Sequence, residues 1–166
     1  MKKGIATIDS KPLENLNREL AKIGEQLAAK AAQIETPVTQ WLVVGANDIR
    51  NTIISSMRDT PQTGQHYKRG GKIHIASSPG NPPAVDSGEL IRSIFYEVRN
   101  MEVEVGNLGG APYYAALENG AVIKRGTGVA VIEPRPSLGP AVDKHKDDIV
   151  RNVGQEVIHI IGNIFK

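Results

Sequence analysis

The first third of the chain carries apolar residues at alternating spacings of three and four. These residues are Leu13, Leu16, Leu20, Ile23 and Leu27. This spacing places them on one stripe of a helix, which we expect from about Pro12 to Gln33 with Ser10 as its cap. Charged residues occupy the other faces, so the apolar seam is as narrow as that of a coiled coil. We therefore expect residues 1–35 to form an amphipathic helix that packs on one long partner in another subunit.

A second helix is predicted directly after the first. Thr36 is a good N-cap and Pro37 a good first helical residue, so we expect a new helix from here to about Met57. Its expected buried face consists of Trp41, Leu42, Ala46, Ile49, Ile53 and Met57. The break divides the chain into the N-terminal helix, 1–35, and an α+β domain, 36–166.

The middle of the chain predicts a loop followed by short strands. The segment Arg58–Gly71 is polar and contains Gly and Pro, which is typical of a long surface loop. We expect Lys72–Ser77 to be a short strand. Alternating residues in Leu90–Val98 and Met101–Gly106 predict a hairpin with a tight turn at Arg99-Asn100.

The last part predicts another hairpin and two more helices. The hairpin joins Ala121–Lys124 to Gly128–Ile132 and has a basic tip, while Tyr113–Leu117 should form a short helix that ends by Gly120. A final helix past Pro140 carries apolar residues at helical spacing. The expected fold class is α+β, with a small antiparallel sheet flanked by long N-terminal and C-terminal helices.

Composition narrows the function classes. The chain has no cysteine, which excludes disulfides, thiolate nucleophiles and cysteine-ligated metals and fits folding in a reducing cytoplasm. The apolar runs are far shorter than the ~20 residues of a membrane span, so we expect no membrane association. The net charge is only +2, and one tryptophan, four tyrosines and two phenylalanines offer few rings for base stacking. A nucleic-acid-binding module is therefore the weaker alternative.

Few residues suggest catalysis. The four histidines are scattered, and none has the spacing of a metal motif, so we expect no metal and no cofactor. Asp86 and Ser87 precede Gly88 and read as a turn. Glu118 is the most interesting carboxylate, because it could hold a backbone end or pair with an arginine; a structural ion pair with Arg135 is favoured over acid catalysis. A hydrolase would need Asp86, Ser87 and Glu118 to converge in one cavity, and we expect no enzyme.

One basic cluster allows a contact with DNA. Lys68, Arg69 and Lys72 lie close together in the sequence, and such a cluster is usually a solvated loop. In a ring-shaped assembly it could instead face passing DNA and contact phosphates without sequence preference.

An ordered set of short motifs carries a resemblance to a known family. The motifs are Pro82-Pro83, Asp86-Ser87-Gly88 with Leu90, Ser93-Ile94, Val105-Gly106, Tyr114-Ala115 with Leu117-Glu118-Asn119-Gly120, and Arg135-Pro136 with Leu138 and Pro140-Ala141. Together they resemble the head–tail joining, or tail-completion, proteins of tailed phages, typified by gene product ten of a lambdoid siphophage. The similarity covers about Trp41 to Val150. The chain departs from the usual pattern at Ala121, where threonine is common, and at Ser137, where an aromatic residue is typical.

The resemblance implies a structural virion protein of the phage neck. Such a protein forms a hexameric ring with copies of itself, between the connector or head-closure proteins and the tail tube, around the DNA channel. We expect the Ala121–Ile132 hairpin and the Arg58–Gly71 loop to contact neighbouring subunits or the tail. The expected interface residues are Tyr114, Glu118, Lys124, Arg125 and Arg135. The alternative within phage assembly is a tail terminator that caps the tail tube.

Overall fold

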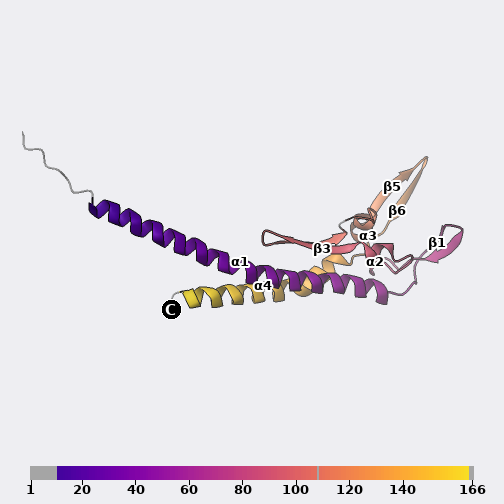
Figure 1. Cartoon of the computed structure of the whole chain (residues 1–166). Coiled ribbons are helices and arrows are strands. Elements are labelled where there is room, and N and C mark those ends of the chain that lie inside the picture. Colours follow the sequence, from indigo (N-terminus) through magenta and orange to yellow (C-terminus); the bar gives the residue numbers. More distant parts are fainter. Residues whose placement is uncertain (1–10, 108, 165–166) are drawn as a thin grey trace, which may run out of the picture.

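The structure, a computed structural model, describes residues 11–107 and 109–164. It confirms the α+β class, with long helices at both ends of the described chain and short antiparallel strands between them (Figure 1). The elements are α1 (Lys11–Asp59), β1 (His66–Arg69), β2 (Lys72–Ile75), α2 (Glu89–Arg92), β3 (Ile94–Arg99), β4 (Glu102–Asn107), α3 (Tyr114–Asn119), β5 (Ala121–Arg125), β6 (Gly128–Ile132) and α4 (Leu138–Ile164).

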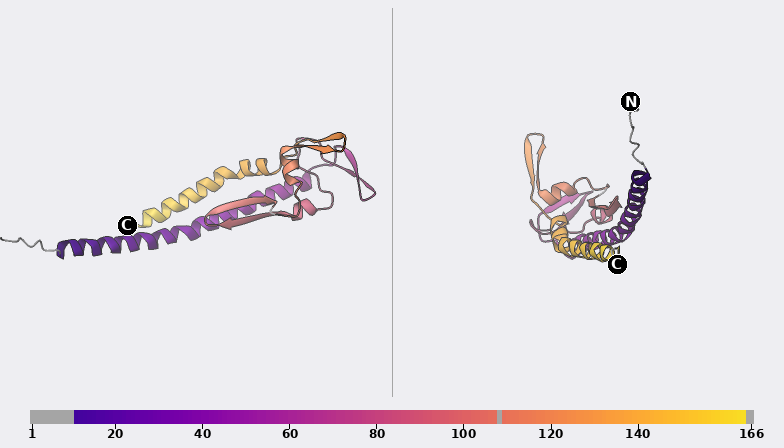
Figure 2. Two further views of the ribbon diagram at one scale, coloured as in Figure 1. Left: turned by 90° about the horizontal axis from the view of Figure 1, so that it is seen from above. Right: turned by 90° about the vertical axis from the view of Figure 1, so that its left-hand side faces the viewer.

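The two long helices form the spine of the molecule. α4 runs antiparallel to the second half of α1, as two contacts show. Thr52 Oγ1 lies 2.8 Å from His145 Nε2, and a Cβ on Gly45 would lie 2.4 Å from Ile149 Cγ1, so the backbones approach closely there. The first part of α1 extends beyond the end of α4, while the short helices gather at the opposite end of the spine (Figure 2).

The predicted helix break at Thr36-Pro37 was wrong. α1 continues through Pro37 as one helix of 49 residues, so the proposed division at residue 35 falls inside it. Proline removes the bond to the carbonyl four residues earlier, here that of Gln33, which is exposed and can be hydrated. Val38, the next residue, is buried. Packing of α1 from this point onward therefore compensates for the lost bond.

The strands form three separate two-stranded hairpins. β1 lies inside the segment Arg58–Gly71 that was predicted to be a loop, so that part of the prediction was wrong, whereas its partner β2 confirms the strand predicted at Lys72–Ser77. β3 pairs with β4 as expected, but its turn lies at Asn100 and Met101, both with positive φ, one residue later than predicted. Leu90 belongs to the short helix α2 and not to a strand.

The C-terminal predictions hold more closely. β5 and β6 form the expected hairpin, with Val122 opposite Val131. α3 ends at Gly120, whose φ of 75° suits glycine, and a Cβ there would approach the carbonyl oxygen of Ile132 to 3.0 Å. α4 begins at Leu138, so Pro140 lies within its first turn, where the missing N–H costs little.

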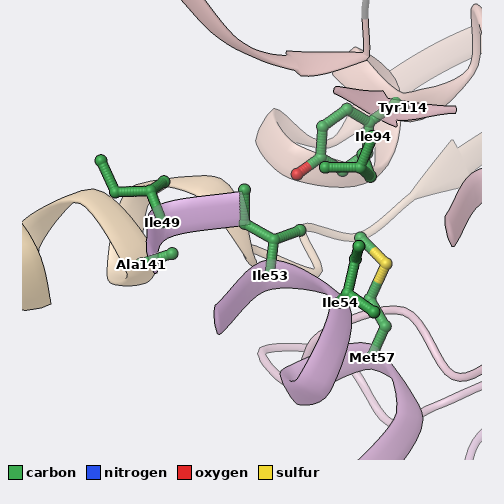
Figure 3. Packing of buried hydrophobic residues seen from close by; sticks show 7 residues of the cluster. All are labelled: Ile49, Ile53, Ile54, Met57, Ile94, Tyr114 and Ala141. Atoms are coloured by element: carbon green, nitrogen blue, oxygen red, sulfur yellow. The ribbon is translucent and has the colours of Figure 1, made fainter. Parts of the chain in front are cut away.

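A small core joins α1 to the hairpin region (Figure 3). It consists of Ile49, Ile53, Ile54 and Met57 of α1 with Ile94 of β3, Tyr114 of α3 and Ala141 of α4. Of the predicted buried face of α1, Ala46, Ile49, Ile53 and Met57 are buried, whereas Leu42 is half-buried and Trp41 is 37% exposed. Arg50 adds a polar tie, because its Nε donates to the carbonyl oxygen of Ile94 at 2.9 Å. The core therefore fixes the start of β3 on α1.

Ile53→Ala is expected to lower the free energy of unfolding by about 2–5 kcal/mol, because Ile53 is fully buried and its loss leaves a cavity between α1 and β3. Urea unfolding followed by circular dichroism at fixed protein concentration measures the change. Val122→Ala is the matched control, since Val122 is 70% exposed and should change stability little. Equal losses for the two variants would contradict this position of the core.

Candidate functional site

Glu118 binds the first turn of α4. Its Oε2 accepts hydrogen bonds from the backbone N–H groups of Ser137 (2.8 Å) and Leu138 (3.1 Å), and its Oε1 accepts one from the N–H of Gly139 (2.9 Å). These N–H groups lack acceptors within the helix, and the positive end of the helix dipole favours a carboxylate there. Glu118 therefore joins the end of α3 to the start of α4.

The predicted ion pair between Glu118 and Arg135 was wrong. Arg135 instead donates from Nε to the carbonyl oxygen of Ser77 (3.2 Å) and from Nη1 to that of Glu133 (3.1 Å). Its own backbone N–H donates to the carbonyl oxygen of Leu117 at 2.6 Å. Arg135 thus fastens the segment before α4 to the segment after β2, and Glu118 fastens the helix itself.

Tyr114 completes this joint from within the core. Its hydroxyl lies 2.8 Å from Ser137 Oγ, and both side chains are buried. Burial raises the pKa of the Tyr114 phenol to about 12. Ser137 Oγ also donates to Glu118 Oε2 at 3.3 Å, so its small side chain contacts both Tyr114 and Glu118.

The β5–β6 hairpin presents an open apolar face. Residues directly opposite in an antiparallel pair share a face, so Val122 and Val131 lie on the same side as Lys124 and Val129. The three valines are 64–70% exposed. The hairpin projects away from the spine (Figure 1), and Arg125 closes β5 at its tip. The predicted contact residue Lys124 therefore lies beside three exposed valines.

The opposite side of this hairpin borders a cavity of about 790 Å³. Ile123 and Ala130 line it from β5 and β6, and the turn around Asp86 lines it from the other side. Met57 of α1 also contributes. The cavity thus separates the hairpin from the turn before α2, with part of the core at its base.

Asp86 is the acceptor that holds the β1–β2 hairpin. His74 Nδ1 lies 2.6 Å from its Oδ1, and its Oδ2 accepts from the Tyr67 hydroxyl at 3.2 Å and from Arg69 Nη1 at 3.4 Å. The Tyr67 and His74 rings stack with centroids 5.6 Å apart. The sequence predicted only a turn at Asp86. The alternation of Tyr67 with Arg69 could have indicated side chains on one face, but their common partner lies 17 residues beyond Arg69.

The predicted DNA contacts have different surroundings. Arg69 pairs with two carboxylates, Asp86 at 3.4 Å and Glu89 at 3.2 Å, and the hydrogen bond that it donates to Glu89 raises the pKa of the Arg69 guanidinium. Lys68 and Lys72 are exposed on the same hairpin. Phosphate contacts at this place would therefore come from the two lysines, whereas Arg69 serves the hairpin's attachment.

The groups considered for hydrolysis have structural contacts. Asp86 binds the β1–β2 hairpin, Ser87 Oγ accepts from the N–H of Glu89 at 3.4 Å, and Glu118 binds α4. Across residues 11–107 and 109–164, no three His, Asp or Glu side chains gather as a metal site would require. In the same residues, no helix has the length and apolar character needed to cross a membrane.

Comparison of the chain with protein-family models, with curated protein sequences and with solved structures finds no match.

Glu118→Ala is expected to lower the free energy of unfolding by about 2 kcal/mol, because the N–H groups of Ser137 and of the first two residues of α4 lose their acceptor. Glu118→Gln should lose less stability, since its amide oxygen can still accept a hydrogen bond from these N–H groups. Urea unfolding gives both values. Glu133→Ala is the control for removing an exposed carboxylate, and a loss as large as that of Glu118→Ala would argue against the capping role.

The raised pKa of Tyr114 predicts that the folded chain loses stability at alkaline pH. Its pKa is about 12 in the folded chain and about 10 when unfolded, so between these values the unfolded state gives up a proton that the folded state keeps. This favours unfolding as pH rises from about 10 to 12, by up to about 2–3 kcal/mol. Tyr114→Phe should flatten the fall, as measured by urea midpoints across this range. Tyr96→Phe, at a partly exposed tyrosine, controls for the loss of a hydroxyl. This variant should lose stability between about pH 10 and 12 more steeply than Tyr114→Phe does.

Proposed function

We propose that this chain is a structural subunit of a tailed-phage neck, which completes the tail and joins it to the DNA-filled head as part of a ring around the DNA channel. The observation that carries the proposal is the open apolar face of the β5–β6 hairpin, with Val122, Val129 and Val131 on a projecting element. Isolated exposed side chains are ordinary, but three on one face of a two-stranded ribbon form a contact surface. A ring subunit needs such surfaces for its neighbours.

The residues that carry the family resemblance support the proposal through what they do. Glu118 and Arg135 lock α3, α4 and the segment after β2 to one another, and Asp86 attaches the β1–β2 hairpin. Gly88 has a φ of 76°, which fixes the turn into α2. These motifs act as joints that set the directions of the two hairpins, as a subunit with fixed neighbours requires.

The proposed function implies several partners. Copies of the chain in a hexameric ring would meet connector or head-closure proteins on one side and the tail tube on the other. The side chains of Tyr114, Glu118 and Arg135 are used inside the subunit, so their role at the interface is to hold the contact elements in place. On the β5–β6 hairpin, Lys124 shares the outward face with the three exposed valines, so it is placed to contact a neighbour directly. Lys68 and Lys72 are the residues that would meet DNA phosphates without sequence preference.

Deletion of the gene from the phage that encodes this chain is expected to leave DNA-filled heads and finished tails that do not join. Electron microscopy of the particles measures this directly, and a plasmid copy of the wild-type gene should restore complete virions. Tails of excessive length would identify a terminator instead. Complete virions without the gene would overturn a function in the neck.

A further inference from the structure

The first part of α1 is an exposed helical arm. Residues 14–29, which we call the arm, are exposed throughout, and they lie beyond the end of α4 (Figure 2). Leu16, Leu20, Ile23 and Leu27 are 51–61% exposed and form one stripe. An isolated helix of this length is marginal in water, and its stability usually comes from packing of its apolar face.

The arm's stripe has mostly uncharged neighbours. The positions that flank it on either side are Asn17, Glu19, Gly24 and Gln26, of which only Glu19 is charged. The other charges of the arm, such as Arg18 and Lys22, lie on the outer faces. A strongly charged partner helix would find no complementary groups here, whereas a neutral apolar helix face would fit.

α4 has a second apolar face that matches this description. Val150 and Ile158 are each 71% exposed and Ile161 is 41% exposed, at spacings that place them on one side of the helix together with Gly154. This side differs from the one that packs on α1, which includes His145 and Ile149. We call it the outer face of α4. One charged side chain borders it, Arg151, which lies seven residues before Ile158 and pairs with Asp148, so the pair adds no net charge to this side.

Gly154 gives the outer face room for a side chain. A Cβ at Gly154 would meet no atom within 4 Å, so nothing in the chain itself requires glycine at this place. Glycine in a helix interior lowers helix stability relative to alanine. A glycine amid exposed apolar residues leaves a depression into which a leucine of another helix can pack.

The two faces are of equal length but cannot meet within one chain. The arm's stripe runs from Leu16 to Leu27 and the outer face from Val150 to Ile161, each over eleven residue steps. α4 lies along the part of α1 that follows the arm, and α1 carries the arm past the end of α4. A second copy supplies the missing surface in each case. Pairing of two arms would cover the stripe but leave the outer face of α4 open.

We propose that the arm of one copy packs on the outer face of α4 of a second copy. The contact is head to tail, so each molecule gives one surface and receives another, and repetition closes a ring where the rotation permits it. This contact would specify how copies meet in the proposed neck ring. The contact itself does not depend on the proposed function; only its place in a virion rests on it.

A mixing experiment with the full chain tests the contact. One variant carries Leu20→Glu and Ile23→Glu in the arm, and another carries Val150→Glu and Ile158→Glu in α4. Each alone should lose self-association by at least about tenfold in apparent Kd, as measured by sedimentation or light scattering. An equimolar mixture should form one-to-one dimers that grow no further, because only one intact arm and one intact outer face can meet.

Matched controls keep the result clear. Arg18→Glu with Lys22→Glu changes charges on the arm's outer faces and should associate like the wild type. Circular dichroism should show a helical, cooperatively melting fold for every variant, since all the substituted residues are exposed or half-exposed. Undiminished self-association of the α4 variant would show arm-to-arm pairing and overturn the proposal. A mixture that stays monomeric, or a wild type that is monomeric, would also overturn it.

The same variants separate this inference from the proposed function. If the arm variant restores virions to a phage lacking the gene, the arm contact is wrong while the neck function stands. If the gene's loss leaves virions intact but the mixture still forms dimers, the contact is right and the neck function is wrong.

Discussion

The hydrogen bonds from the first turn of α4 to Glu118 determine where the C-terminal helix begins and therefore how it lies along α1. A carboxylate at this place satisfies N–H groups that the helix cannot satisfy itself. The buried Tyr114–Ser137 contact fixes the same joint from below. With α4 held there, its residues His145 and Ile149 meet α1, and the remaining surface of the helix faces outward. The joint thus decides which side chains of α4 pack on α1 and which remain exposed.

Periodicity predicted the helices and hairpins wherever packing follows the local pattern, as in β3–β4, β5–β6 and α4. It failed at Pro37 because proline, which is common at the start of a helix, is also tolerated inside this one. Gln33, whose carbonyl loses its donor, is exposed, and Val38, which follows the proline, is buried. It failed at β1 because that strand is held by contacts with Asp86, distant in sequence, and not by an apolar face. For Glu118 the sequence left a backbone end and an arginine open as partners; the favoured arginine was wrong, because the N–H groups that bind Glu118 lie 19–21 residues further along the chain.

The polar groups that first suggested chemistry hold the fold together. Asp86 and Glu118 each accept several hydrogen bonds, and Arg69 and Arg135 each reach two acceptors. The folded chain also leaves apolar side chains exposed: three valines on one hairpin, four residues on the arm and those of the outer face of α4. Apolar side chains that gather on one face of an element are typical of contact surfaces.

Pro37 also has a mechanical consequence. It interrupts the hydrogen-bond ladder of α1 close to where the helix leaves the packed body, so this is the place where the helix bends most readily. The stretch before it is a lever of roughly 40 Å, and a bend of about 10° would move its tip by about 7 Å. A bend at this one missing hydrogen bond would thus move the arm by more than the pitch of a helical turn.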